Sequence, residues 1–308
     1  MANKQFSIIT ICFNDKDGLE KTILSTIHQS FKNFEYIVID GGSTDGSKIV
    51  IENYSSRIDY WVSEPDKGIF DAMNKGTKKA TGNYLIFMNA GDTFHSDSVL
   101  QEINNLNINT DIICGYTITN NNGNYTHQHK ANLIELLMYS SLSHQGTFIK
   151  RELCLKYLYD IRYKTASDWK FWIQTLIVNN YTMNYCDIIV ANQDMTGITT
   201  GQDSKDKQDE ERSKILLELF PKIVTKEDFP FREQIVKRTA QLLQERMHIA
   251  VVKHNSQLFK IRKKELLQLD KNDLIHFLGN NSKILLFIKT NYLTIYLYLF
   301  VRKRIKGY

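Results

Sequence analysis

The sequence predicts an α/β fold in which helices cover both faces of a mostly parallel sheet. Short apolar runs rich in β-branched residues alternate with helical patterns through the first 115 residues. Continuous apolar runs of this kind are typical of parallel strands that are buried on both faces. A chain that alternates strands and helices brings each strand back into one sheet in the same direction.

The first strand is expected over the run FSIITIC, Phe6 to Cys12. A helix follows, and Asp17 with Glu20 three residues later is typical of an N-cap with a capping box. Apolar side chains then recur at every fourth position, which gives this helix one apolar stripe. The stripe consists of Leu19, Ile23 and Ile27.

Further apolar runs predict the remaining strands, at residues 36–39, 60–62, 84–88 and 111–114. A hairpin is expected over residues 116–127, because NNNG supplies turn residues between two extended segments. Helical patterns occur at residues 133–138 and 169–178.

Polar clusters follow four of the predicted strands. In open parallel sheets, ligands bind beyond the carboxyl ends of the strands, where the connecting loops gather at one edge. We therefore expect the functional residues of this chain in the segments that directly follow the strands. These segments are residues 14–15, 40–45, 64–71 and 89–92.

The net charge of +5 conceals an uneven distribution. Residues 1–200 carry 17 Lys and Arg against 21 Asp and Glu, whereas residues 246–308 carry 13 against 3. We predict three parts: the sheet domain over 1–200, a polar linker with helices over 201–245, and a basic, aromatic-rich helical region over 246–308. The polar stretch 199–212 is expected to be a flexible connection.

The basic region over residues 246–308 is expected to bind an anionic surface. Its aromatic and aliphatic residues suit a membrane interface, at which Lys and Arg meet lipid phosphates. No nucleic-acid-binding motif accompanies the charge, so nucleic acid is not an expected partner. An ordinary helical subdomain with a solvated basic face is the alternative.

The cysteines and the N-terminus indicate a cytoplasmic protein. The four cysteines form no CxxC pair and are expected to be buried thiols in a reducing compartment. The N-terminus lacks the apolar segment of a signal peptide, and no run of about 20 apolar residues predicts a membrane-spanning helix.

Three segments together resemble family 2 glycosyltransferases. They are ITICFND, VIDGGSTDGS and SEPDKGIFDAMNKGTKKATGNYLIFMNAGD. The resemblance covers roughly residues 5–200, and it is greatest to enzymes that make bacterial surface polysaccharides, of the colanic-acid and O-antigen type. It implies the GT-A fold and a nucleotide-sugar donor.

By this resemblance, the donor nucleoside is held by the loop after the first strand and by the DGGSTD turn, whose glycines permit close backbone approach. Many relatives carry a second acidic residue where this chain has Gly41, so the nucleotide is open among UDP, GDP and dTDP, with UDP favoured. Turn and helix-cap chemistry is the alternative role of the acidic residues. The expected donor contacts here are Thr10, Phe13, Asn14, Asp40, Gly42 and Ser43.

The segment EPDKGIFDAMNKG resembles the donor-binding loop and helix of the same enzymes. Asp66 is one of its polar positions, and Lys67 would meet a phosphate as a point charge, the alternative being a solvated Lys in a turn. Gly68 is expected to free the turn before the helix. Asp71 and Asn74 lie three residues apart, on one helical face, and are further candidates for donor binding.

The tetrapeptide NAGD lies where GT-A enzymes carry their acidic metal motif, DxD or a variant. Asp92 is its one carboxylate and the expected ligand of Mg²⁺ or Mn²⁺, which would hold the donor diphosphate. Asn89 and Ala90 are expected to contact the donor, and a turn-capping role for Asp92 is the alternative.

The resemblance also implies an acidic catalytic base before an aromatic helix. Asp168 is the matching carboxylate, and Ser167 stands where relatives have Glu. Such a base takes the proton from the acceptor hydroxyl, and the alternative is an ordinary residue at a helix start. The expected acceptor side consists of His144, Gln145 and Trp169.

The expected function is that of an inverting glycosyltransferase. By resemblance, its acceptor would be a hydroxyl of a glycan carried on polyprenyl diphosphate, and the protein would be peripheral on the inner face of the cell membrane. A catalytically inactive protein that binds nucleotide sugars, or a scaffold of a glycan assembly complex, is the main alternative. A nucleotidyltransferase is less favoured because FND lacks the Gly-rich, basic loop of that class, and a dehydrogenase because no GxGxxG follows the first strand.

Overall fold

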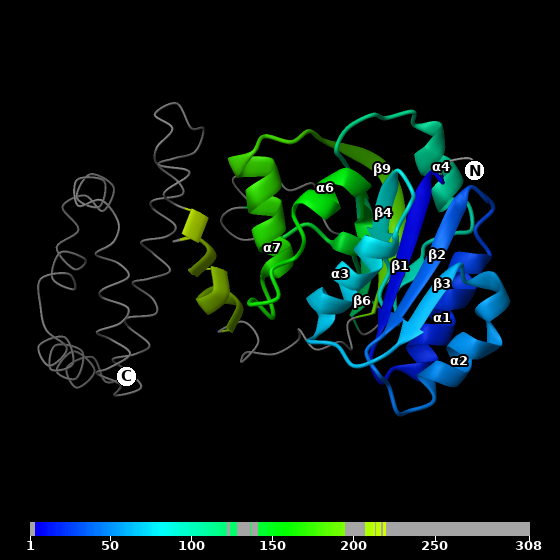
Figure 1. Cartoon of the computed structure of the whole chain (residues 1–308). Coiled ribbons are helices and arrows are strands. Elements are labelled where there is room, and N and C mark those ends of the chain that lie inside the picture. The colour runs from blue at the N-terminus through cyan, green and yellow to red at the C-terminus, as the bar shows by residue number, and fades with distance from the viewer. Residues whose placement is uncertain are drawn as a thin grey trace, which may run out of the picture. The chain divides into compact units, whose positions relative to one another are not determined.

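A computed structural model describes residues 4–121, 124–127, 136, 141–194, 207–212, 214–216 and 218–219. The chain divides into two compact units, Met1–Ser204 and Lys205–Tyr308. The first unit contains the sheet and the labelled helices (Figure 1). Most of residues 201–245 and the whole basic region 246–308 lie outside the described residues, so their predicted roles stay predictions.

The first half of the sheet is parallel, as the sequence predicts. Its strands are β1 (Phe6–Cys12), β2 (Phe34–Asp40), β3 (Tyr60–Ser63) and β4 (Tyr84–Phe87), in the order β3-β2-β1-β4. β1 pairs in parallel with both β2 and β4, and β2 pairs in parallel with β3. The four loops that follow these strands therefore gather at one edge.

The second half of the sheet is mixed. β8 (Thr147–Lys150) runs antiparallel to β4 and to β6 (Ile112–Asn121). β9 (Met183–Gln193) is parallel to β6 and antiparallel to β5 (Thr93–Phe94). β7 (Asn124–His127) pairs with β6 and confirms the predicted hairpin. The predicted α/β fold is confirmed, although β5, β8 and β9 were not expected from the sequence.

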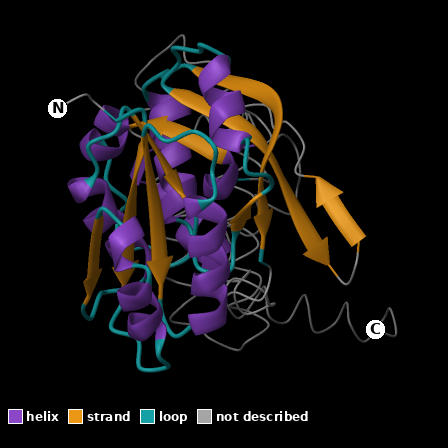
Figure 2. Ribbon diagram, turned by 90° about the vertical axis from the view of Figure 1, so that its right-hand side faces the viewer, coloured by secondary structure: helices purple, strands orange, loops and turns teal. Residues whose placement is uncertain are grey.

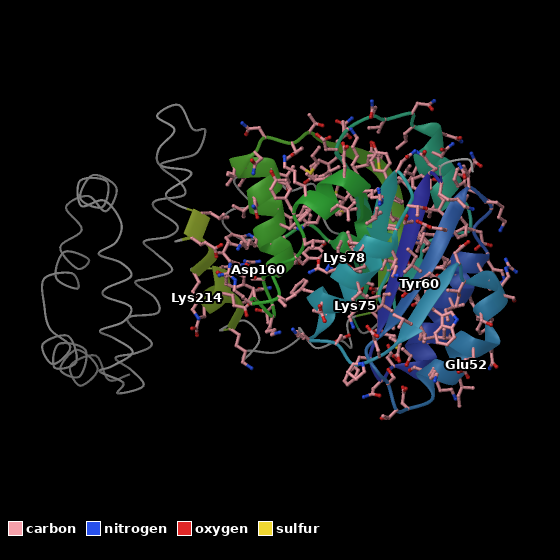
Figure 3. The ribbon with its side chains drawn as sticks, viewed as in Figure 1. Glu52, Tyr60, Lys75, Lys78, Asp160 and Lys214 are labelled. Carbon is pink, nitrogen blue, oxygen red and sulfur yellow. The ribbon has the colours of Figure 1, made fainter. Side chains whose placement is uncertain are left out.

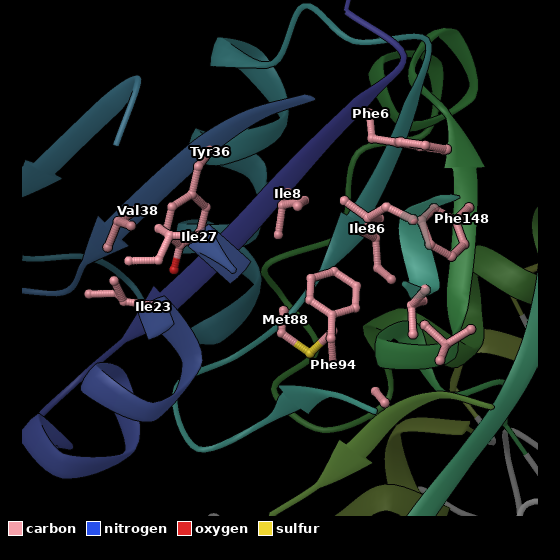
Figure 4. Packing of buried hydrophobic residues seen from close by; sticks show 14 of the residues in the cluster. Phe6, Ile8, Ile23, Ile27, Tyr36, Val38, Ile86, Met88, Phe94 and Phe148 are labelled. Atoms are coloured by element: carbon pink, nitrogen blue, oxygen red, sulfur yellow. The ribbon is translucent and has the colours of Figure 1, made fainter. Parts of the chain in front are cut away.

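Helices cover both faces of the sheet (Figure 2). α1 (Lys16–Ile27) and α3 (Ile69–Lys79) both pack on β1, and the alternation of side chains along β1 shows that they lie on opposite faces. Ile8 belongs to the core that contains the apolar stripe of α1 (Figure 4). Ile9 faces α3, where a Cβ on Gly76 would lie 2.4 Å from its Cγ2.

The other helices are short. They are α2 (Ser47–Asn53), η1 (Ser55–Arg57), α4 (Val99–Asn105), η2 (His144–Gly146), α6 (Arg151–Lys156), α7 (Ser167–Trp172) and the π-helix η3 (Ile173–Val178). The last two confirm the helical pattern at 169–178. Of the predicted helix at 133–138, the structure describes residue 136 alone.

Two local predictions are wrong. The N-cap of α1 is Asp15 rather than Asp17, because the Asp15 carboxylate accepts a hydrogen bond from the backbone N–H of Gly18 at 3.0 Å. Residues 207–212, expected to be part of a flexible connection, are helical.

The four cysteines are free and buried, as predicted. Within the part of the chain that the structure describes, no helix is long and apolar enough to cross a membrane.

Candidate active site

The loops after β1 and β2 are locked together. Asn14 has a positive φ of 52°, and its backbone N–H donates to Oγ of Ser43 at 2.8 Å. Its side-chain Oδ1 accepts from the backbone N–H of Thr44, also at 2.8 Å. Asn tolerates the left-handed conformation better than most residues, which explains its place at this turn. The predicted donor residues Asn14 and Ser43 are thus brought into contact.

Asp40, the last residue of β2, holds the same loops together through hydrogen bonds. Its carboxylate is buried and accepts from the backbone N–H of Ser43 at 3.0 Å, from the hydroxyl of Ser63 at 2.6 Å, and from the hydroxyl of Ser43. A carboxylate has about four acceptor positions, so three of them already serve the protein. Asp40 joins the DGGSTD turn to the end of β3.

The two glycines of this turn make room for the loop after β3. Gly42 has a φ of +84°, and a Cβ there would lie 3.1 Å from the backbone nitrogen of Pro65. At Gly41 a Cβ would lie 2.6 Å from Oδ2 of Asp66 and 3.2 Å from the ring of Phe13. The Asp66 carboxylate therefore occupies the space into which a side chain at position 41 would project.

Phe13 presents an unusual surface beside this carboxylate. Its side chain is 61% exposed at the end of β1, although large apolar residues are usually buried. An exposed ring next to a carboxylate suits a ligand with both a flat face and N–H donors.

The segment before α3 is held by its own acidic residues. Asp66 accepts from the backbone N–H of Gly68 at 2.7 Å, and Asp71 accepts from that of Lys67 at 3.0 Å. Gly68 has a φ of +112°, which favours glycine, and it is the N-cap of α3. The Lys67 side chain is exposed at this edge, and its backbone carbonyl accepts from Nζ of Lys164 at 2.8 Å.

One ion pair and one hydrogen bond of Lys75 support this arrangement. Lys75, which is labelled in Figure 3, lies 2.8 Å from a carboxylate oxygen of Glu64 and also donates to the Pro65 carbonyl. Both contacts join α3 to the loop after β3.

Asn74, Thr10 and Trp169, which were predicted as site residues, lie in the interior. The side-chain amide of Asn74 makes two hydrogen bonds with the backbone of Tyr159. Its Nδ2 donates to the Tyr159 carbonyl at 2.8 Å, and its Oδ1 accepts from the Tyr159 N–H at 2.9 Å. Thr10 is buried and lies 3.0 Å from the hydroxyl of Tyr36. Trp169 is 1% exposed, and its Nε1 donates to the carbonyl of Leu136 at 2.8 Å. These side chains stabilise the fold around the site.

The NAGD turn follows β4 and packs against α1. Its Ala90 N–H donates to the carbonyl of Ile11, and Thr22 on α1 donates to the carbonyl of Asp92 at 2.7 Å. The Asp92 side chain is only 3% exposed and faces inward. One carboxylate oxygen accepts from Nε2 of Gln145 and the other from the backbone N–H of Asp194, each at 2.9 Å. Burial raises the pKa of Asp92 to about 7.

The segment from Ser141 to Gly146 connects this turn with α7. His144 lies with Nε2 2.9 Å from the amide nitrogen of Asn89, and burial lowers its pKa to about 4, so the ring is neutral and accepts this hydrogen bond. At the start of the same segment, the Ser141 hydroxyl lies 3.5 Å from Oδ2 of Asp168. His144 and Gln145 therefore lie against the NAGD turn, and Ser141 lies against the predicted base.

Asp168 is half-buried in the first turn of α7. Its Oδ1 accepts from the backbone N–H of Trp169 at 2.7 Å, which holds the carboxylate at the start of the helix. Beside it, the hydroxyls of Ser167 and Tyr159 are buried without a hydrogen-bond partner among the described residues. The nearby charge of Asp168 contributes to the raised pKa of Tyr159, which burial chiefly causes.

Some residues of this network were not predicted from the sequence. Gln193 donates from Nε2 to Ser143 at 2.5 Å and to Oε1 of Gln145 at 2.8 Å. Gln193 is the last residue of β9 and Asp194 follows it. Asp194 is exposed next to the NAGD turn. The apolar run at residues 188–191 is the signal in the sequence that could have placed this strand.

Metal binding has to be judged from this donor set. Within the described residues, no group of three or more His, Cys, Asp and Glu side chains is placed to hold a metal ion. Mg²⁺ in phosphate-binding sites is usually held by only one or two carboxylates, together with waters and substrate phosphates. Oδ1 of Asn89 is buried and lacks a hydrogen-bond partner among the described residues, so the turn offers an unused oxygen. The donor set fits a divalent cation that binds with the diphosphate.

The fold and these loops identify the class of protein. Residues 7–167, just over half of the chain, match glycosyl transferase family 2. The chain belongs to this family, and its sheet has the GT-A fold. The match ends one residue before Asp168.

Relatives by sequence include two mycobacterial proteins. An uncharacterized glycosyltransferase of Mycobacterium tuberculosis (strain CDC 1551 / Oshkosh) is 42% identical over 97 residues, which are 31% of this chain and 37% of that protein. The chain thus aligns with little more than a third of this relative. A PGL/p-HBAD biosynthesis glycosyltransferase of Mycobacterium bovis is 29% identical over 204 residues, 64% of this chain and 79% of the relative.

Solved structures share the fold. Residues 1–349 of S. aureus TarS in complex with UDP-GlcNAc have a TM-score of 0.56 at 13% identity, covering 86% of this chain and 92% of that chain. The mannosyltransferase PcManGT from Pyrobaculum calidifontis, in complex with GDP-Man and Mn²⁺, has a TM-score of 0.54 at 14% identity, covering 99% and 88%. At these identities the likeness concerns the fold alone.

Proposed function

We propose that this protein is an inverting glycosyltransferase that uses a nucleotide sugar, with UDP-sugars the first choice. The acceptor would be a hydroxyl of a glycan carried on a polyprenyl diphosphate lipid, in the synthesis of a bacterial surface polysaccharide such as O-antigen or capsule. Membership of the family supports the reaction class. The observation that carries the proposal is the segment from Ser141 to Gly146, which contacts both the NAGD turn and Asp168.

The donor would bind at the edge formed by the loops after β1, β2 and β3. Phe13 offers a face for the base, and Asp66 offers a carboxylate for base or ribose N–H and O–H groups. The exposed Lys67 can meet a phosphate. Asn14, Asp40 and Ser43 hold the backbone of these loops in place.

Asp168 would act as the general base. Its carboxylate takes the proton from the acceptor hydroxyl while that oxygen attacks the anomeric carbon. The bond between the anomeric carbon and the diphosphate oxygen breaks in the same step, and the nucleoside diphosphate leaves with the electron pair. Ser141 and the helix start orient the carboxylate, and the buried aromatic residues of α7 limit its solvation.

Asn89 and Asp92 are the residues of the NAGD turn that would hold Mg²⁺ or Mn²⁺. When bound, the cation would balance the negative charge that develops on the departing diphosphate. His144, which is neutral, would keep the Asn89 amide oriented through its 2.9 Å hydrogen bond.

The acceptor would reach the protein at the membrane. Residues 246–308 carry 13 Lys and Arg against 3 Asp and Glu, among many aromatic and aliphatic residues. Each basic residue near an anionic surface contributes about 1 kcal/mol of attraction. We propose that this region holds the protein peripherally on the inner face of the cell membrane.

The test is release of nucleoside diphosphate from UDP-, GDP- and dTDP-sugars by the purified full chain, with polyprenyl-diphosphate-linked acceptors. Asp168→Asn should lower the transfer rate by about 10²- to 10⁴-fold and leave nucleotide affinity unchanged. Glu152→Gln, which removes an exposed carboxylate from the first turn of α6, is the matched control. Transfer by Asp168→Asn at the rate of the unaltered protein would contradict the assignment of the base.

A protein that binds nucleotide sugars without turnover is the second candidate. It is favoured by one observation, that both carboxylate oxygens of Asp92 already accept hydrogen bonds within the protein. Nucleotide binding in calorimetry with no release from any donor, on any of the acceptors, would support it.

A further inference from the structure

Gly91, the third residue of the NAGD turn, has no side chain, and the side chain of Asp194 lies in the space beside it. Gly91 has a φ of +93°, and a Cβ there would lie 2.9 Å from Oδ2 and 3.2 Å from Cγ of Asp194. The carboxylate of Asp194 therefore lies directly over Gly91. It occupies the space that a side chain at the third position of this tetrapeptide would enter.

Asp92, the one carboxylate within the turn, faces the other way. Both of its carboxylate oxygens accept hydrogen bonds from the protein, and the residue is only 3% exposed. Asp194, in contrast, is exposed beside the turn, so its side chain is accessible from solvent. A cation that needs an accessible anionic oxygen meets Asp194 first.

Asp194 is held in this place by its neighbours in the chain. Its backbone N–H donates to Oδ1 of Asp92, and the preceding Gln193 donates to Ser143 and to Gln145. The end of β9 is further fixed by β5, where Asn192 pairs with Thr93. The carboxylate thus projects from an anchored strand end.

Asn89, the first residue of the NAGD turn, supplies a neutral oxygen. Oδ1 of Asn89 is buried and has no hydrogen-bond partner among the described residues. Carboxylate and amide oxygens are the ligands that hard divalent cations prefer. An unpaired buried oxygen costs free energy unless a ligand meets it, which favours a cation or its bound water at this point.

We propose that Asp194 supplies the carboxylate ligand of the divalent cation at the NAGD turn, in the place that Gly91 leaves open. Asp92 then serves mainly to position the turn and the backbone of Asp194. The inference rests on the proposed function, because it concerns the cation of that reaction, and it changes which residue meets the metal.

The first experiment measures Mn²⁺ binding rather than activity. The free Mn²⁺ signal in electron paramagnetic resonance is followed as the full chain is added, with Mn²⁺ alone and then with UDP or GDP. Asp194→Ala and the isosteric Asp194→Asn should each weaken Mn²⁺ binding by about 10-fold or more. Asp97→Asn, which removes an exposed carboxylate elsewhere on the same unit, should leave binding unchanged.

The second experiment moves the carboxylate back into the turn. Gly91→Asp in the Asp194→Ala background should regain most of the lost Mn²⁺ affinity, because the space over position 91 is then open. Asp is among the residues that best tolerate the positive φ of this position. In the presence of Asp194, Gly91→Asp should gain nothing, since its Cβ would meet that side chain.

Two results would overturn the inference: Mn²⁺ affinity of folded Asp194→Ala and Asp194→Asn equal to that of the unaltered protein, or no recovery in the folded double variant. Circular dichroism establishes that each variant is folded. If Mn²⁺ binding follows the expected pattern but no donor is turned over, the role of Asp194 stands and the proposed transfer reaction fails.

Discussion

The two halves of the sheet build their parts of the site in different ways. In the parallel half, β3-β2-β1-β4, each strand runs into its own polar loop, and the loops contact one another directly. In the mixed half, the site depends on segments that are remote in the sequence. Asp194 meets Asp92 across 102 residues, and Gln145 meets Asp92 across 53. The donor-binding loops are therefore positioned by the strands that they follow. The segments around Asp92 and Asp168 are positioned instead by tertiary packing.

The largest effect should come from the core under the parallel half. Ile8→Ala removes a fully buried side chain between β1 and α1 and should lower the free energy of unfolding by about 3–4 kcal/mol. Ile188→Ala, on β9, removes a partly buried side chain and should cost about 1 kcal/mol. Urea unfolding followed by tryptophan fluorescence measures both. Equal losses would show that the two halves are equally dependent on their cores.

Asn74 tests whether a predicted donor residue acts through the fold. Asn74→Ala leaves the backbone N–H and C=O of Tyr159 without their partner and should cost about 2–3 kcal/mol of stability. Asn53→Ala, at the exposed end of α2, should stay within about 0.5 kcal/mol. If Asn74→Ala kept its stability and lost nucleotide affinity in calorimetry, the original donor assignment would be the better one.

Asp160, which follows β8 and α6 in the chain, should give the molecule an acid sensitivity. Asp160 is labelled in Figure 3, and hydrogen bonds from Arg162 and then from Lys170 lower its pKa. Because the pKa of Asp160 is lower in the folded than in the unfolded chain, where it is about 3.9, the stabilisation is complete above about pH 5 and is lost as pH falls.

Asp160→Asn should therefore lower stability at pH 7 by about 1–2 kcal/mol and flatten its fall toward pH 3. Thermal unfolding between pH 3 and pH 7 measures this, with Asp97→Asn as the control. If Asp160→Asn lowered the stability by the same amount at every pH, the effect would come from packing and not from charge.

The smallest effect concerns the donor edge itself. Gly41→Ala would place a Cβ 2.6 Å from the Asp66 carboxylate and displace it. Since Gly41 has no positive φ, the backbone should accept Ala, and stability should change by less than about 1 kcal/mol. Affinity for UDP, measured by calorimetry, should fall by about tenfold, or about 1.4 kcal/mol. Unchanged affinity would exclude Asp66 from nucleotide binding.

The same contrast explains what could be predicted from the sequence. β1 to β4 are apolar runs followed by polar loops, so both strands and site segments were expected at nearly the right residues. β5 has only two residues, which is too short for a periodic pattern. β8 has only two apolar residues, Phe148 and Ile149, and β9 contains many half-exposed positions. Their partners are set by packing, which local patterns do not encode.

Some residues were predicted to contact a ligand because of their residue type, but their side chains bond to the protein instead. Asn74 and Trp169 have side chains that suit ligand binding, but both use their polar atoms on the protein backbone. Asp92 is the acidic residue of its motif, yet its carboxylate faces inward. Which way a side chain turns depends on partners such as Gln145, at a sequence separation of 53 residues, that the motif does not contain.

The buried cysteines have a practical consequence. The chain has four, all of them free and buried, and burial raises the pKa of Cys12 to about 11 and that of Cys114 to about 12. Thiols of this kind react slowly with maleimides and iodoacetamides at neutral pH. One cysteine introduced at the exposed Lys67 could therefore carry a fluorophore without removal of any native cysteine, and it would report nucleotide binding from the donor edge itself.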